Sequence, residues 1–324
     1  MTPLTASQPS QPEATLSIPR PTLSREDLMR LRVRDPLQTV VYLLSVGVGI
    51  VLAVCLYVWA PGPVTLIAAF VLIAGLQHHL SIVHHEAVHH LLFASRRWNE
   101  LIGCVAAYPV GFTMAYRRQH FDHHNLLGTD RDPDLPNYRS YPTTLSTMLL
   151  AIAKDLSGVA AVTQFMRQSR HTPRPPSMDE PFSPKSRRDV VGLAAAQLGV
   201  LAAFWAVGHP TLYLTLWLLP LVTLAKTLTH LRNIARHAQI RDVGDPELSR
   251  YRTTRVGPIE RFFFAPMNFN YHAEHHFYPM IPWHNLPEAH RLLSSHPAYA
   301  KAVETERGVL HFIFRKAVQP AGAA

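Results

Sequence analysis

Residues 37–93 decide the fold, and they read LQTVVYLLSVGVGIVLAVCLYVWAPGPVTLIAAFVLIAGLQHHLSIVHHEAVHHLLF. Residues 36–85 contain no Asp, Glu, Lys or Arg, a run of 50 residues. A helix needs about 20 apolar residues to cross a bilayer, so this run is long enough for two spans. The Pro-Gly-Pro sequence at 61–63 predicts a tight turn between a span at about 37–60 and a second at about 64–93.

A second run without charged residues extends from Val190 to Ala225. The Gly-His-Pro sequence at 208–210 divides it and predicts a third span at about 190–207 and a fourth at about 211–228. Only 16% of the 324 residues are charged, against roughly 25% in soluble domains. We therefore predict an all-α integral membrane protein with four transmembrane helices in two hairpins.

The remaining segments are polar. Residues 1–21 are rich in Pro, Ser and Thr and have no apolar period, so we expect a disordered tail before a single domain at 22–324. The segments 94–188 and 229–324 contain no further span, and we expect them to form a helical cap.

The basic residues predict the orientation of the chain. Lys and Arg number 31 against 22 Asp and Glu, and they lie in the tail, the middle loop and the C-terminal region, whereas both turns between spans are uncharged. By the positive-inside rule, both termini and the cap are expected in the cytoplasm, at the inner membrane if the source is bacterial. Basic residues beside spans suit membrane lipids, so no nucleic-acid binding is predicted.

Histidine is the second unusual feature. Twelve of the 20 histidines fall in three short stretches, HHEAVHH at 84–90 together with 78–79, HFDHH at 120–124 and HAEHH at 272–276. On a helix, residues three and four apart share a face, so an HxxxH or HxxHH sequence directs two or three imidazoles to one place. Asn233 and His237 are also four residues apart, where the last span enters the cytoplasm. Imidazole is the commonest metal ligand among protein side chains.

The number of imidazoles predicts more than one metal ion. Eight or nine exceed the three or four ligands of a zinc site, so at least two ions are implied. Imidazole suits Zn, Cu, Fe and Ni, and iron is the one among these that commonly combines with dioxygen at nitrogen-rich sites. The candidate metal-site residues are His85, His89, His120, His123, His124, His237, His272, His275, His276 and Asn233. The carboxylates expected to orient these rings are Glu86, Asp122, Asp130, Asp132, Asp134 and Glu274.

Three segments together resemble the membrane fatty acid desaturase family: HEAVHHLLF (85–93), RRQHFDHHNLLGTDRDPDLP (117–136) and NYHAEHHFYPMIP (270–282). The resemblance covers about residues 80–285. It implies four membrane helices, a cytoplasmic cap and a non-haem centre of two Fe ions that activates O2 as co-substrate and abstracts hydrogen from a lipid. It also implies that His85 and His89, the two HxxHH sequences and His237 bind iron, and that Asn233 contacts iron through water.

The resemblance leaves two points open. We call the three histidine motifs boxes: the first is HEAVH at 85–89, the second HFDHH at 120–124 and the third HAEHH at 272–276. His84 and His90 flank the first box, so the ligand pair there could be shifted by one residue. The 324 residues leave no room for a fused cytochrome or ferredoxin, so a separate electron donor is expected, a ferredoxin or rubredoxin with its reductase. An acidic carrier would suit the basic cytoplasmic face.

Fatty acyl desaturation is the function that this pattern favours, and other functions remain as alternatives. The same scaffold supports a lipid hydroxylase, a ketolase or an oxidative decarboxylase. An intramembrane zinc protease would use His85, Glu86 and His89 as an HExxH motif, but would leave both HxxHH sequences unexplained. A metal carrier or sensor would place its ligands through the bilayer and on both faces.

Overall fold

The structure is a computed structural model that describes residues 21–169, 186–238 and 251–319. Residues 1–20 of the tail that we expected to be disordered lie outside the described residues. In chain order, the elements are α1 (Arg25–Leu31), α2 (Pro36–Trp59), α3 (Pro63–Val88), α4 (Arg96–Ala107), η1 (Tyr108–Val110), α5 (Tyr116–Leu126), η2 (Leu135–Asn137), β1 (Thr143–Thr144), α6 (Leu145–Leu156), α7 (Val159–Ser169), α8 (Arg187–Ala206), η3 (Tyr213–Leu218), η4 (Leu221–Ala225), α9 (Lys226–His237), β2 (Arg252–Thr254), α10 (Pro258–Phe264), η6 (Pro266–Asn268), α11 (His272–Phe277), η7 (Trp283–Asn285), α12 (Leu286–Ser294), α13 (Tyr299–Ala302), β3 (Glu304–Glu306), α14 (Val309–Phe312), η8 (Ile313–Ala317) and β4 (Val318–Gln319).

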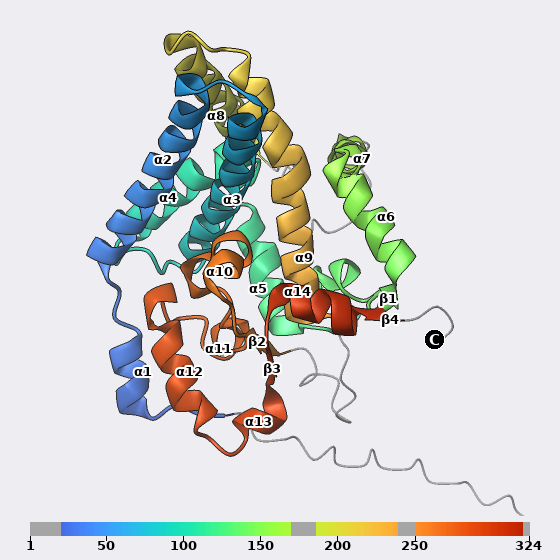
Figure 1. Ribbon diagram of the computed structural model, residues 1–324. Helices are drawn as coiled ribbons and strands as arrows, with labels where there is room; N and C mark the ends of the chain where they lie inside the picture. The colour runs from blue at the N-terminus through green and yellow to red at the C-terminus, as the bar shows by residue number, and fades with distance from the viewer. Residues whose placement is uncertain (1–20, 170–185, 239–250, 320–324) are drawn as a thin grey trace, which may run out of the picture.

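Four helices among the described residues are long and apolar enough to cross a membrane, which confirms the predicted fold class. They are α2, α3, α8 and a continuous helix at Tyr213–His237 in which the π-helical η3 and η4 lead into α9. Over an apolar stretch of 18 residues in each helix, 17% of the residues of α2 and 11% of those of α8 are buried, against 56% in each of the other two helices. Hence α2 and α8 present their apolar side chains to lipid, and the other two form the core of the bundle (Figure 1).

Local sequence explains where the spans begin. The Asp35 carboxylate accepts a hydrogen bond from the N–H of Gln38 at 2.9 Å and so caps α2, and a proline follows at the first helical position. Ser186 caps α8 in the same way, accepting from the N–H of Asp189 at 3.1 Å. Gly208, with φ of 81°, turns the chain between α8 and the fourth span.

The second span ends earlier than the sequence predicts. We expected a helix through Phe93, but α3 ends at Val88, and the next residues reverse direction through His90 with φ of 58°. The Asn99 side chain explains the early end, because it accepts the N–H of Leu92 at 3.0 Å and donates to the Phe93 carbonyl at 2.7 Å. These hydrogen bonds hold residues 91–93 outside the helix, and they depend on a partner that no helical period reveals.

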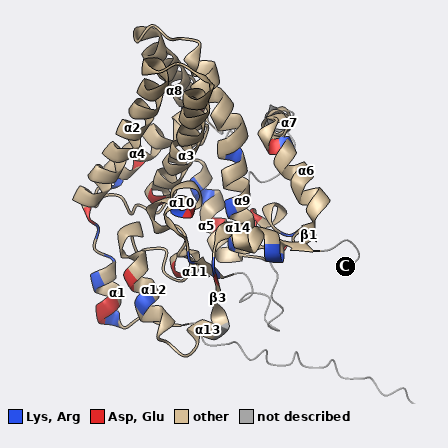
Figure 2. Ribbon diagram, in the orientation of Figure 1, with Lys and Arg blue, Asp and Glu red and all other residues tan. Residues whose placement is uncertain are grey.

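The histidine-bearing helices α5 and α11 and the end of α9 gather at one end of the bundle (Figure 1). Figure 2 shows that charged residues also gather along the ribbon of this cap, whereas the turns at the opposite end, residues 60–62 and 207–212, contain none. The cap also contains two short parallel sheets that we did not predict, β1 with β4 and β2 with β3. Each sheet pairs an earlier strand of the cap with a strand between residues 304 and 319, and so fastens this last part of the described chain to the rest of the cap.

The polar middle segment contains a helical hairpin, α6 and α7, whose turn lies at Gly158 with φ of 76°. α6 packs against η4 and α9, and the hairpin lies beside the last span in Figure 1. Several of its large apolar side chains are exposed, among them Leu149, Leu150, Leu156 and Val162. Such an exposed apolar face on a short amphipathic helix is typical of a helix that lies in the membrane interface.

Candidate metal centre

The nine histidines proposed as ligands come from four parts of the chain, and the fold brings them together. His85 lies in the last turn of α3, and His89 is the residue that caps its C-terminus, one turn further on. The second box lies within α5, the third forms most of α11, and His237 is the last residue of α9. All four helices end or begin in the cap, so their imidazoles meet at one place.

Five of these histidines form the first group: His85, His89, His120, His124 and His275. Each offers one ring nitrogen, and these atoms all lie within 4.8 Å of one another. The Nε2 atom of His120 lies 2.7 Å from that of His89 and 3.0 Å from that of His124. Such a set of nitrogen donors can hold one metal ion.

A second group lies directly beside the first. His123, His237 and His276 offer nitrogen atoms within 4.8 Å of one another. His272 joins them, because its Nε2 atom lies 2.8 Å from that of His237 and 3.0 Å from that of His276. The stacked rings of His124 and His276, with centroids 4.2 Å apart, link the two groups. Two adjacent sets of imidazoles can therefore hold two ions.

Burial keeps most of these rings in the form that binds metal. Burial lowers the pKa values of His120, His124, His272, His275 and His276 well below the ordinary histidine value, and neighbouring positive charge lowers them further. The pKa of His89 falls to about 3 for the same reasons. These rings are neutral at physiological pH, and each keeps a lone pair for a metal ion.

His123 differs because two carboxylates face its second ring nitrogen. Its Nδ1 atom donates to Asp132 at 2.9 Å, and Asp134 lies 3.9 Å away. Burial by itself would lower the pKa of His123, but Asp134 and Asp132 together outweigh it and raise that pKa. A carboxylate behind an imidazole fixes the orientation of the ring and makes its other nitrogen a better ligand.

The other candidate carboxylates separate into distinct roles. Glu86 is buried, and its Oε1 lies 3.3 Å from Nδ1 of His85, while its Oε2 accepts the main-chain N–H of Trp283 at 3.2 Å. Asp122 and Asp130 are exposed. The sequence did not distinguish these two from the buried acids, because all of them follow or lie within the same motifs.

Glu274, the acidic residue of the third box, is fully buried, and its carboxylate contacts residues other than the proposed ligands. Its carboxylate accepts a hydrogen bond from Tyr299 and one from Thr253, and it lies 2.7 Å from Nδ1 of His290. These contacts fasten α11 to the C-terminal region. Glu274 thus positions the whole helix that carries His272 and His275.

Two tyrosines contribute contacts that the sequence analysis missed. The Tyr116 hydroxyl lies 2.7 Å from Nδ1 of His120, and the Tyr138 hydroxyl donates to Asp132. Tyr116 precedes His120 by four residues on α5, so helical spacing was the signal that could have found it. Tyr138 had no such signal, because a loop brings it back to Asp132.

Asn233 is buried beside two arginines. Its side-chain oxygen accepts hydrogen bonds from Arg236 and, at 3.2 Å, from Arg232, and all three residues are buried. His84 and His90, which flank the first box, belong to neither of the two groups found among the described residues. His84 packs against Phe112, and His90 is half-buried at the surface. Of the histidines at 84–90, the structure therefore groups His85 and His89 with the imidazoles of the other segments.

Comparison with known proteins agrees with this arrangement. The family model described as fatty acid desaturase matches residues 57–308. The dihydrorhizobitoxine desaturase of Bradyrhizobium elkanii is 27% identical over 74% of this chain and 71% of its own length. The sphingolipid delta(4)-desaturase DES1 of Drosophila melanogaster is 26% identical over 79% of this chain and 74% of its own length. The DES1 protein of Xenopus tropicalis is 25% identical over 71% of this chain and 67% of its own length. The chain belongs to the fatty acid desaturase family and is a membrane oxidoreductase of the lipid-desaturase type.

Proposed function

We propose that the chain is a non-haem di-iron enzyme that desaturates a fatty acyl lipid. The overall reaction is R–CH2–CH2–R′ + O2 + 2 e⁻ + 2 H⁺ → R–CH=CH–R′ + 2 H2O. The observation that carries the proposal is the pair of adjacent histidine groups, one of five imidazoles and one of four. Two iron ions held there would supply the oxidising power to remove hydrogen from an unactivated C–H bond.

The residues of the chain prepare this chemistry. The imidazoles are the proposed ligands, and Glu86 and Asp132 hold one ring in each group in a fixed orientation. Most of the rings are buried, so bulk water has little access to the centre. Asn233 remains a candidate for a contact through water, as the family resemblance implies.

The geometry favours this function over the two alternatives of a different class. A zinc protease needs Glu86 as a general base, but both oxygens of that carboxylate face groups of the protein. A metal carrier would need ligands along the whole bundle. The two groups found among the described residues lie together at one end.

The substrate that we propose is a lipid with a polar head group. Two of the relatives are sphingolipid delta(4)-desaturases, so their names give a sphingolipid as substrate and a double bond at position 4. We infer a fatty acyl chain for this protein and leave hydroxylation, keto-group insertion and oxidative decarboxylation as products that the assay distinguishes.

We further propose that the cap and both termini lie in the cytoplasm and that residues 22–324 act as a single domain. The distribution of Lys and Arg supports the orientation, because the loops at the other end of the bundle are uncharged (Figure 2). Electrons would come from a separate ferredoxin or rubredoxin and its reductase, which dock on the basic face of the cap.

Expression in a host that lacks desaturase activity tests the function. We expect purified protein to contain two irons, and membranes given dioxygen and reduced carrier to form an unsaturated lipid detected by mass spectrometry. His124→Ala should abolish the product, and His209→Ala, at an exposed turn position far from the cap, should not. Zinc in place of iron, without oxygen consumption, would overturn the proposal.

A further inference from the structure

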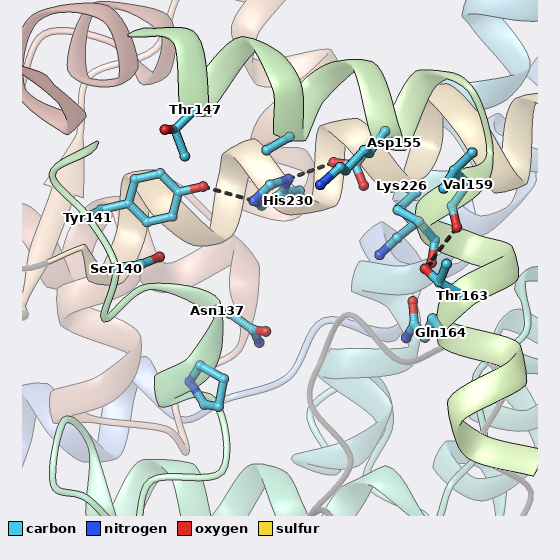
Figure 3. A pocket seen from close by; sticks show the side chains of 14 residues that line it. Asn137, Ser140, Tyr141, Thr147, Asp155, Val159, Thr163, Gln164, Lys226 and His230 are labelled. Carbon is cyan, nitrogen blue, oxygen red and sulfur yellow. Dashed lines mark hydrogen bonds and ion pairs between the residues drawn. The ribbon is translucent and has the colours of Figure 1, made fainter. Parts of the chain in front are cut away.

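A cavity of about 510 Å³ lies between the hairpin of α6 and α7 and the last spanning helix. Its walls come from η2 and the loop after it, from α6 and α7, and from α9 (Figure 3). The volume falls within the range of about 300 to 1,000 Å³ that is typical of small-molecule sites. The proposed ligands are absent from its lining, so it is a site separate from the metal centre.

Two walls of this cavity continue into the metal centre. Asn137, which lines the cavity, is followed by Tyr138, whose hydroxyl holds Asp132 behind His123. His230 lines the cavity from α9, and His237 follows seven residues later on the same helix. Seven residues of helix rise about 10 Å. A molecule held in the cavity is therefore about two helical turns from the proposed iron site.

The cavity also lies beside the end of the fourth span that leads into the cap. Its α9 wall belongs to the fourth span, and its outer wall is the α6–α7 hairpin with its exposed apolar side chains. Leu150 and Val162 on that hairpin are 56% and 58% exposed, which suits contact with lipid. A lipid that enters from the adjacent leaflet would bring its polar end to this level.

The polar groups of the cavity favour an anion. Among the lining residues that the structure describes, Lys154 contributes an ammonium group, and Asp155 contributes the one carboxylate. That carboxylate lies 2.6 Å from Nδ1 of His230, whose Nε2 lies 3.2 Å from the Tyr141 hydroxyl (Figure 3). That carboxylate is thus already engaged with an imidazole, and Lys154 brings a positive charge to the described lining.

Asn137 adds a donor that needs an acceptor. Its Nδ2 atom is buried and has no hydrogen-bond partner among the residues that the structure describes. A buried amide without a partner costs about 1–3 kcal/mol of desolvation, and buried polar groups in native proteins are usually satisfied. An oxygen atom of a bound molecule in the cavity would satisfy it.

We propose that this cavity binds the anionic head group of the lipid substrate, a carboxylate or a phosphate, through Asn137 and Lys154. The inference rests on the proposed function, since it takes the lipid to be the substrate. The head group would fix the position of the acyl chain along α9, so its distance from the histidine groups would determine which C–C bond is desaturated.

Binding of radiolabelled palmitate and methyl palmitate to the purified full-length protein, under nitrogen, tests the site without turnover. The two probes share a chain and differ in the charge of the head. Asn137→Asp and Lys154→Ala should each lower the affinity for palmitate by about tenfold or more and leave methyl palmitate unaffected. The matched controls, Asn125→Asp and Arg139→Ala, change exposed residues outside the cavity and should bind both probes as the wild type does.

Three outcomes would overturn the proposal: unchanged palmitate binding in both variants, equal loss of both probes, or complete displacement of palmitate by inorganic phosphate alone, which would indicate a site for a free anion. Iron content is measured on the same samples. Protein that binds palmitate with this head-group preference but contains no iron would support the site while contradicting the proposed function.

Discussion

Replacement of Asp132 by asparagine should weaken metal binding, whereas the same replacement at Asp130 should not. The two residues are separated by a single position in the sequence GTDRDPD at 128–134, and nothing in that sequence ranks one above the other. In the structure, Asp132 is buried against His123, and Asp130 is exposed. The pair therefore isolates the effect of the contact from that of charge in this loop.

The magnitude follows from the four hydrogen bonds that Asp132 accepts. Its Oδ1 accepts from Nδ1 of His123 at 2.9 Å and from the N–H of Asp134 at 2.8 Å, and its Oδ2 accepts from the N–H of Gly128 at 2.8 Å and from the Tyr138 hydroxyl. Asparagine has one acceptor oxygen, so in either orientation at least one main-chain N–H loses its partner. The free energy of unfolding should fall by about 1–3 kcal/mol.

The effect on the metal is expected to be larger than the effect on the fold. Loss of the carboxylate behind a metal-bound imidazole lowers metal affinity by about 10- to 100-fold. Iron retained against increasing chelator, measured by elemental analysis of the detergent-purified variants, gives this number directly. If Asp132→Asn kept its iron as the wild type does while Asp130→Asn lost it, the assigned role of the contact would be wrong.

Three further predictions concern stability, and thermal unfolding in detergent measures each. Chelation of the bound metal should lower the unfolding temperature, and added iron should restore it. When free metal is 100-fold above its Kd, the metal should add about 2.7 kcal/mol to the free energy of unfolding. Gly192→Ala should cost about 1–3 kcal/mol, because its Cβ would lie 2.3 Å from the Tyr108 ring, whereas Gly199→Ala, with nothing within 4 Å, should be neutral or stabilising. Arg252→Ala should cost about 3–5 kcal/mol, because Arg252 is buried with Glu304, and Arg291→Ala at the surface should change nothing measurable.

The spans could be predicted from the sequence because a bilayer imposes a simple rule on composition. The uncharged run at 36–85 and its Pro-Gly-Pro turn have no other physical explanation than two crossings. The end of the second helix could not be predicted in the same way. It depends on Asn99 of α4, whose side chain binds the backbone of residues 92 and 93 where α4 packs against α3.

Helical spacing predicted which residue types could meet, but not which roles the acids would take. Glu86, Asp130, Asp132 and Glu274 are equivalent in a sequence read for carboxylates near histidines. Burial and partners separate them, since Glu86 and Asp132 contact rings, Glu274 fastens a helix, and Asp130 faces solvent. Those differences arise from Trp283, Tyr138 and other residues that lie far away in the sequence or return through a loop.

The two HxxHH boxes are used in opposite ways, and this explains why both are needed. In α5, His120 and His124, four residues apart, belong to the first group, and His123 belongs to the second. In α11 the assignment is reversed, because His272 and His276 lie in the second group and His275 in the first. Residues four apart on a helix point in the same direction. The histidine directly before the last one in each box, His123 or His275, points in a different direction and so reaches the other group. Each box therefore supplies a pair of imidazoles to one group and a single imidazole to the other, which a lone HxxxH sequence cannot do.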